Sequence, residues 1–131
     1  MSRAENDARI RTTALVRAGW GVILLTLPGP LLRAGGGGPV PAAAVAVARV
    51  LGLRHLLQAG TTAAVPTGAV AGLGALADMA HASSCLALAA GSRRWRRVAL
   101  ADALIEAGFA AAGWRDRPQA RVRPTYTLRA R

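Results

Sequence analysis

Long apolar runs alternate with short polar or glycine-rich segments along the chain. Four such runs cover residues 13–32, 40–59, 65–90 and 98–114. Each run is long enough for a helix to cross the hydrocarbon layer of a bilayer, which takes about 17–25 residues. The pattern therefore predicts an all-α bundle of four transmembrane helices with short loops.

Small residues recur at four-residue spacing in the second, third and fourth runs. This spacing places them on one face of a helix, where they allow two helix backbones to approach closely in lipid. We expect helix packing through the pairs Ala42/Ala46, Gly68/Gly72, Ala71/Ala75, Ala99/Ala103 and Ala107/Ala111.

Proline, glycine and charged residues separate the runs. The triplet Pro28-Gly29-Pro30 is predicted to end or kink the first helix, because proline cannot continue the backbone hydrogen bonding. Residues 33–39 are expected to form a flexible connector, and residues 60–64 a tight turn. Residues 1–12 form a polar segment outside the membrane, and residues 115–131 a basic, disordered tail. A cleaved signal peptide is disfavoured because acidic residues interrupt the basic N-terminal region.

The basic residues are concentrated around the apolar runs. The 131 residues carry a formal net charge of +11, and all seventeen basic residues are arginine. Arginines bracket the runs and cluster at 93–97 around Trp95, as expected for anchors at anionic lipid headgroups rather than for a nucleic-acid surface. We therefore predict a multi-pass protein of the cell inner (plasma) membrane. The distribution of arginines favours cytoplasmic termini.

Several ionisable residues lie inside the apolar runs, where charge is energetically expensive. Asp78, His81 and Cys85 share one helix face, with Ser84 beside them. If the second turn is centred near residue 62, Asp78 lies about three residues, or roughly 4–5 Å, out of level with Arg49. A turn near residues 94–95 places Glu106 close to His81. The predicted intramembrane cluster is Arg49, Asp78, His81, Ser84, Asp102 and Glu106, and the predicted second polar group near a membrane surface is Arg17, Arg54, His55 and Gln58.

The simplest interpretation of the cluster is a set of structural ion pairs, Arg49–Asp78 and His81–Glu106, that fix the helix register. A proton or ion pathway through Asp78, His81 and Glu106 is the alternative, since such chains occur in proton relays. A metal or haem site is less well supported, because two-metal sites in helix bundles need more carboxylate and histidine motifs than this chain has. No catalytic residue, metal or cofactor is predicted, and the absence of lysine excludes lysine chemistry.

The segments Arg49-x-x-Gly52-x-Arg54-His55-x-x-Gln58 and Asp78-x-x-His81-x-x-Ser84 resemble small uncharacterised four-helix integral membrane proteins of high-GC bacteria. The resemblance covers residues 13–114 and implies a membrane location without an activity. The predicted function is that of a non-catalytic packing or accessory component of a membrane assembly, formed with copies of itself or with a larger membrane complex. The alternative is proton- or ion-coupled transport through the Asp/His/Glu cluster. The protein is not expected to be an enzyme.

Overall fold

The computed structural model describes residues 3–36 and 38–116, and this part of the chain is helical without strands. Its five helices are α1 (Arg3–Thr26), α2 (Pro28–Gly36), α3 (Ala42–Ala64), α4 (Gly68–Gly91) and α5 (Arg96–Arg115). The all-helical prediction is confirmed, but the number of helices is five rather than four. The predicted polar N-terminal segment is helical from Arg3 onwards and forms the first part of α1. The predicted tail falls, from residue 117 onwards, outside the described residues.

The predicted first span is broken into α1 and α2. The two helices meet at Leu27 with a bend of 85°. Pro28 and Pro30 follow directly and lack the backbone N–H groups that a continuous helix needs. The expected kink is therefore confirmed. The prediction of a flexible connector is wrong for residues 33–36, which form the end of α2. Helix α2 lies beside α3 and α5.

The second turn lies later in the chain than the sequence pattern suggested. Residues 60–64 remain helical, and the turn is formed by residues 65–67. Pro66 accounts for the position, because a proline disfavours helical geometry in the residue before it. Val65 accordingly has non-helical dihedral angles (φ −131°, ψ 75°), and Thr67 caps the start of α4 by accepting a hydrogen bond from the Val70 N–H at 3.3 Å. The shift from residue 62 to Pro66 is about one helical turn.

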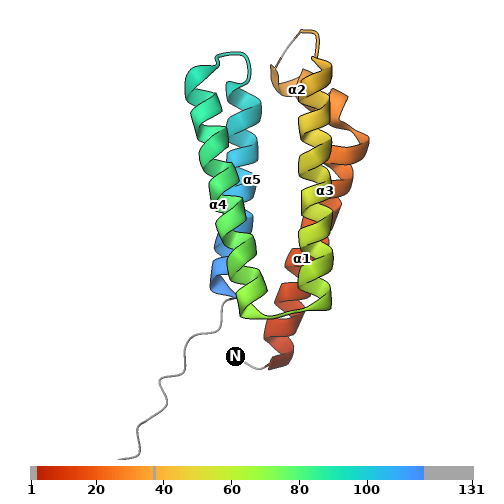
Figure 1. Ribbon diagram of the computed structural model, residues 1–131, viewed down its shortest axis with the longest axis vertical. Helices are drawn as coiled ribbons and strands as arrows, with labels where there is room; N and C mark the ends of the chain where they lie inside the picture. The colour runs from red at the N-terminus through yellow and green to blue at the C-terminus, as the bar shows by residue number, and fades with distance from the viewer. Residues whose placement is uncertain (1–2, 37, 117–131) are drawn as a thin grey trace, which may run out of the picture.

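The four long helices form two closely packed pairs, α1 with α3 and α4 with α5 (Figure 1). Glycine permits the close approach in the first pair: a Cβ atom at Gly52 would lie 2.7 Å from the Gly21 carbonyl oxygen. In the second pair, a Cβ atom at Gly113 would lie 2.8 Å from the Ala71 carbonyl oxygen. A gap separates the ribbons of the two pairs (Figure 1). The side chains of Arg17 and Arg54 from the first pair reach Asp78 of the second pair. The start of α1 and the end of α5 lie at the same end, joined by an ion pair of 2.6 Å between Arg9 and Asp116.

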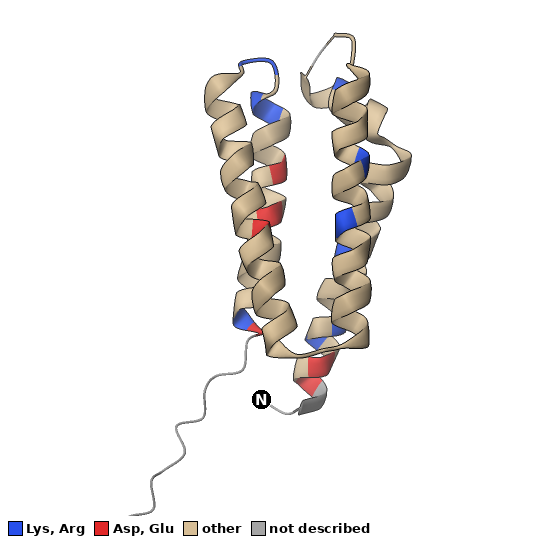
Figure 2. Cartoon of the chain, in the orientation of Figure 1, with Lys and Arg blue, Asp and Glu red and all other residues tan. Residues whose placement is uncertain are grey.

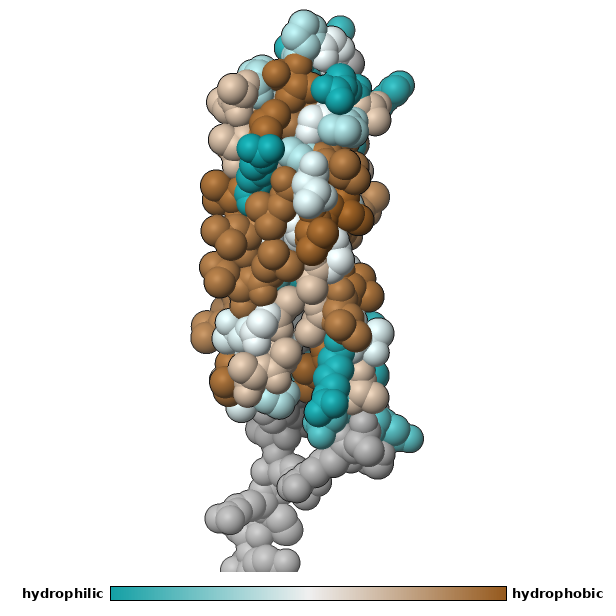
Figure 3. All heavy atoms as spheres, turned by 90° about the vertical axis from the view of Figure 1, so that its right-hand side faces the viewer, coloured by the Kyte–Doolittle hydropathy of each residue, from teal (hydrophilic) through white to brown (hydrophobic). Residues whose placement is uncertain are grey.

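The distribution of side chains is the reverse of that in a water-soluble helical protein. The largest fully buried side chains are His55, Asp78 and Glu106, while the buried apolar residues are mostly alanine. Most of the large aliphatic residues point outward, and apolar side chains cover much of the middle of the face shown in Figure 3. Exposed examples are Leu15, Val47, Val50, Leu57, Leu73, Leu76, Leu86 and Leu104. Such an apolar surface around a polar interior suits a surrounding of lipid.

Two helices, α3 and α4, are long and apolar enough to cross a membrane. Their 23 and 24 residues correspond to about 34 and 36 Å at the usual helical rise, compared with a hydrocarbon layer of about 30 Å. The bent pair α1–α2 would add a third crossing if the two helices together count as one span. Helix α5 is less apolar and carries Asp102 and Glu106.

Candidate functional site

A layer of buried polar side chains lies between the two helix pairs. The basic members come from α1 and α3, which contribute Arg17, Arg54 and His55. The acidic members, Asp78 and Glu106, come from α4 and α5. Figure 2 shows acidic positions on the α4–α5 side of the molecule and basic positions on the α3 side at a similar height. Two guanidinium groups therefore face two carboxyl groups across the boundary between the pairs. We call these five residues, together with Gln58, the central layer.

Asp78 lies at the centre of this layer and is fully buried. Arg17 binds it with both arms of the guanidinium, Nη1 donating to Oδ1 at 2.9 Å and Nη2 to Oδ2 at 2.5 Å. Arg54 Nη2 donates to Oδ1 at 2.7 Å, and Gln58 Nε2 adds a longer contact of 3.4 Å to the same oxygen. Such paired, charge-assisted hydrogen bonds are among the strongest in proteins. Asp78 thus joins α4 to both α1 and α3.

Glu106 is equally buried but is bound less completely. Its Oε1 lies 2.8 Å from His55 Nε2, and its Oε2 lies 3.7 Å from Arg54 Nη2. These are ion-pair distances, yet neither carboxylate oxygen has a hydrogen bond of good geometry within the described residues. The same holds for both ring nitrogens of His55. A buried polar pair with unused hydrogen-bonding capacity is costly and calls for a specific explanation, such as a functional role or an ordered water molecule.

Phe109 of α5 covers the layer on one side. Its ring centroid lies 4.3 Å from the Arg17 Cζ atom and 5.6 Å from the His55 ring centroid. A guanidinium over the face of an aromatic ring is attracted by the ring's electron density, and this attraction strengthens away from water. The aromatic ring therefore helps to hold Arg17 in position for Asp78.

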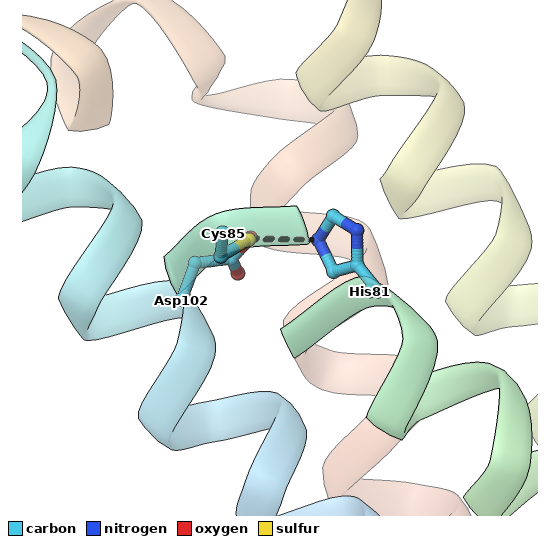
Figure 4. A group of neighbouring side chains, drawn as sticks. All are labelled: His81, Cys85 and Asp102. Carbon is cyan, nitrogen blue, oxygen red and sulfur yellow. Dashed lines mark hydrogen bonds and ion pairs between the residues drawn. The ribbon is translucent and has the colours of Figure 1, made fainter. Parts of the chain in front are cut away.

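A second polar group lies where α4 packs against α5 (Figure 4). His81 and Cys85 are one helical turn apart on α4, and Asp102 faces them from α5. His81 Nε2 lies 2.9 Å from Asp102 Oδ2, and Cys85 Sγ lies 3.5 Å from each of these two atoms. The three donor atoms converge on one point. We call these residues the α4–α5 cluster.

The structure changes the predicted grouping of residues. The predicted Arg49–Asp78 pair is wrong: Arg49 is exposed, and Arg17 and Arg54 bind Asp78 instead. The predicted His81–Glu106 pair is also wrong, because His81 pairs with Asp102 and Glu106 with His55. Ser84 lies outside both groups, exposed and hydrogen-bonded at 3.0 Å to the Ala80 carbonyl oxygen of its own helix.

The residues assigned to a second group near a membrane surface all belong to the central layer. Asp78 is contacted directly by Arg17, Arg54 and Gln58. Glu106 is contacted by His55. The reason is the position of the turn. Arg54 and Asp78 each lie twelve residues from Pro66, so a turn centred there brings them to the same level. Pro66 was the signal in the sequence that could have located this layer.

A small cavity leads toward the central layer from the end where α1 begins and α5 ends. It has a volume of about 30 Å³, and its lining includes Arg17 and Gln58 as well as Thr13 and Asp116. A larger depression of about 280 Å³ shares Thr13 and Asp116 with it. The lining also includes the apolar residues Ile10, Ala14 and Ala71. A cavity of this size with polar groups in its wall can hold an ordered water molecule beside the central layer.

Comparisons with known protein families, with curated proteins and with solved structures find no match for this chain. Its function has to be inferred from the chemistry of the two polar groups. The central layer offers charge pairing and proton transfer, and the α4–α5 cluster offers nitrogen, sulfur and oxygen ligands.

Proposed function

We propose that the chain is a multi-pass integral membrane protein in which α1, α3, α4 and α5 all cross the bilayer. The outward-facing aliphatic surface and the buried charges support this arrangement. Helix α5 packs along α4 and so lies at the same depth. Its acidic residues, Asp102 and Glu106, are turned toward neighbouring helices. Carbonate extraction of membranes that contain the protein should leave it in the pellet, and release into the soluble fraction would contradict the proposal.

The function that the geometry supports best is that of a non-catalytic packing or accessory component of a membrane assembly. The observation that carries this proposal is the binding of Asp78, which accepts hydrogen bonds from Arg17, Arg54 and Gln58. A carboxylate so fully occupied serves to join helices rather than to react. The apolar outer face remains available for lipid or for a membrane partner.

Crosslinking and affinity purification from native membranes test this function. We expect a stoichiometric membrane partner or a defined oligomer of the chain. A protein that is monomeric and without a partner in native lipid would contradict an accessory role. As a specificity control, Leu104→Arg would place a charge on an exposed apolar position of α5 and should weaken a partner contact there without changing the central layer.

A second candidate function is proton- or ion-coupled transport. It is favoured by the Glu106–His55 pair, which is fully buried and lacks hydrogen bonds of good geometry among the described residues. Histidine and carboxylate groups in contact can pass a proton between them. The small cavity beside Arg17 and Gln58 lies next to the same layer and could hold a water molecule there.

Liposomes that carry a pH gradient distinguish the two functions. If the central layer conducts protons, wild-type protein should dissipate the gradient faster than empty liposomes, and Glu106→Gln should abolish the effect. Asp7→Asn is the matched control, since Asp7 is exposed near the start of α1. Wild-type liposomes that are no leakier than empty ones across pH 5 to 8 would exclude simple proton conduction.

The expected location is the inner (plasma) membrane, with the termini in the cytoplasm and arginines against anionic headgroups. The ion pair Arg9–Asp116 supports a common side for the start of α1 and the end of α5. Topology reporters fused at both termini and in the 92–95 loop would test the orientation. Cytoplasmic signals from the loop together with external termini would invert it.

A further inference from the structure

The α4–α5 cluster has the composition of a transition-metal site. Its imidazole nitrogen, thiol sulfur and carboxylate oxygen are the three ligand types that zinc uses in proteins. They come from two helices that are packed firmly together, so their relative positions are fixed by the fold. Thiolate and imidazole ligands select zinc-like cations over magnesium and calcium, which prefer oxygen.

The distances between the ligand atoms fit one small cation. In a tetrahedral zinc site with ordinary bond lengths, sulfur lies about 3.5 Å from a nitrogen or oxygen ligand, and nitrogen lies about 3.4 Å from oxygen. Cys85 Sγ lies 3.5 Å from both His81 Nε2 and Asp102 Oδ2. His81 Nε2 and Asp102 Oδ2 are 2.9 Å apart and would need to separate by about 0.5 Å. A small side-chain rotation achieves this separation.

Access and charge also suit a cation. The side chains of His81 and Asp102 are 19 % and 16 % exposed, so their ligand atoms are partly accessible at the surface of the α4–α5 pair, while Cys85 is buried behind them. A zinc ion with one thiolate, one carboxylate and one neutral imidazole carries no net charge. Neutrality lowers the cost of placing the ion in a surrounding of low polarity.

We infer that His81, Cys85 and Asp102 form a three-ligand site for Zn²⁺ on the α4–α5 pair, with a fourth position open to water or another ligand. Binding forms Zn–N, Zn–S and Zn–O bonds and releases the thiol proton of Cys85 to the solvent. No metal is predicted from the sequence, which places Cys85 on one helix face with Asp78 and His81; the structure groups Cys85 and His81 with Asp102 instead.

Cobalt substitution in the full-length protein, purified in detergent and stripped with a chelator, tests the site. We expect one Co²⁺ per chain, a sulfur-to-cobalt charge-transfer band, and displacement of cobalt by Zn²⁺ but not by Mg²⁺. Cys85 is the only cysteine in the chain, so a thiolate band reports this site alone. Absence of the band from the wild-type spectrum would overturn the inference, whatever the behaviour of the variants.

Variants then assign the ligands. Cys85→Ser should lose the band, and both Cys85→Ser and Asp102→Asn should lower the zinc affinity at least about 100-fold, since loss of even an outer-shell partner costs 10–100-fold. Ser84→Ala is the matched control, because Ser84 neighbours Cys85 but bonds only within its own helix. Circular dichroism checks that each variant remains folded. Zinc affinity unchanged in folded Cys85→Ser or Asp102→Asn would show that the ion binds elsewhere and would reject the site.

Discussion

Arg17 of α1 and Asp78 of α4 are 61 residues apart in the sequence and form a two-armed ion pair, with N–O distances of 2.9 and 2.5 Å. This ion pair connects the two helix pairs, α1–α3 and α4–α5. Both side chains are buried, so the attraction is little screened by solvent. Removal of one partner leaves the other charge buried without compensation.

Asp78→Asn should be strongly destabilising. The substitution keeps the size of the side chain but leaves the guanidinium groups of Arg17 and Arg54 without their shared carboxylate. Breaking a buried pair in this way costs roughly 3–5 kcal/mol of unfolding free energy. Chemical denaturation in detergent measures the loss. Asp7→Asn, at an exposed position, should change the stability by less than about 0.5 kcal/mol. Equal stabilities of the two variants would show that Asp78 does not hold the helix pairs together.

Arg17→Leu should destabilise the protein strongly, whereas Arg49→Leu should have little effect. Arg17 is buried against Asp78, and its removal should cost roughly 3–5 kcal/mol. Arg49 is exposed, so its replacement by leucine should change the unfolding free energy by no more than about 0.5 kcal/mol. Thermal unfolding of both variants in the same detergent measures the two losses of stability. A large loss of stability in Arg49→Leu but not in Arg17→Leu would support the Arg49–Asp78 ion pair expected from the sequence.

Gly52→Ala should weaken the contact between α1 and α3. The added Cβ atom would lie 2.7 Å from the Gly21 carbonyl oxygen and 2.9 Å from Leu25 Cγ, so the helices would have to separate. Overpacking of this kind costs about 1–3 kcal/mol. Gly60→Ala on the same helix meets nothing within 4 Å and should stabilise the protein by up to about 1 kcal/mol through helix propensity. The prediction fails if both variants are stabilised equally.

Phe109→Leu should remove the aromatic contact with Arg17 while keeping most of the buried apolar volume. The guanidinium carbon lies 4.3 Å from the ring centroid, and a desolvated contact of this type is worth about 2 kcal/mol. A double-mutant cycle with Arg17→Leu separates this contact from the loss of packing. A coupling energy near zero would mean that the ring only fills space.

The helical fold and its approximate boundaries follow from the sequence, because long apolar runs and prolines act locally. Pro28 and Pro30 locate the break in the first run, and four runs give four long helices. The second turn was misplaced because Gly60 and two threonines resemble turn residues. In the structure, Thr61 Oγ1 hydrogen-bonds at 2.7 Å to the Leu57 carbonyl oxygen, and the helix continues to Ala64.

The candidate site depends on register and on rotation, which are less accessible to sequence reasoning. All the charged residues of the central layer were identified, but an error of one helical turn at Pro66 assigned Asp78 to the wrong arginine. The pairing of His81 with Asp102 rather than Glu106 depends on how α5 is rotated about its axis. A count of residues from the turn gives the depth of a side chain but not its direction.

Within the central layer the basic residues lie on one helix pair and the acidic residues on the other, and this has a consequence for biogenesis. The first half of the chain is synthesised with Arg17 and Arg54 before the carboxylates of Asp78 and Glu106 exist. A charged residue at the middle of an inserting helix costs about 2.5–3.5 kcal/mol at the translocon. Neither the half before residues 65–67 nor the half after them should therefore fold stably alone, and each should be degraded when expressed separately. Halves divided at residues 65–67 and expressed together should reassemble, because each supplies the counterions that the other lacks.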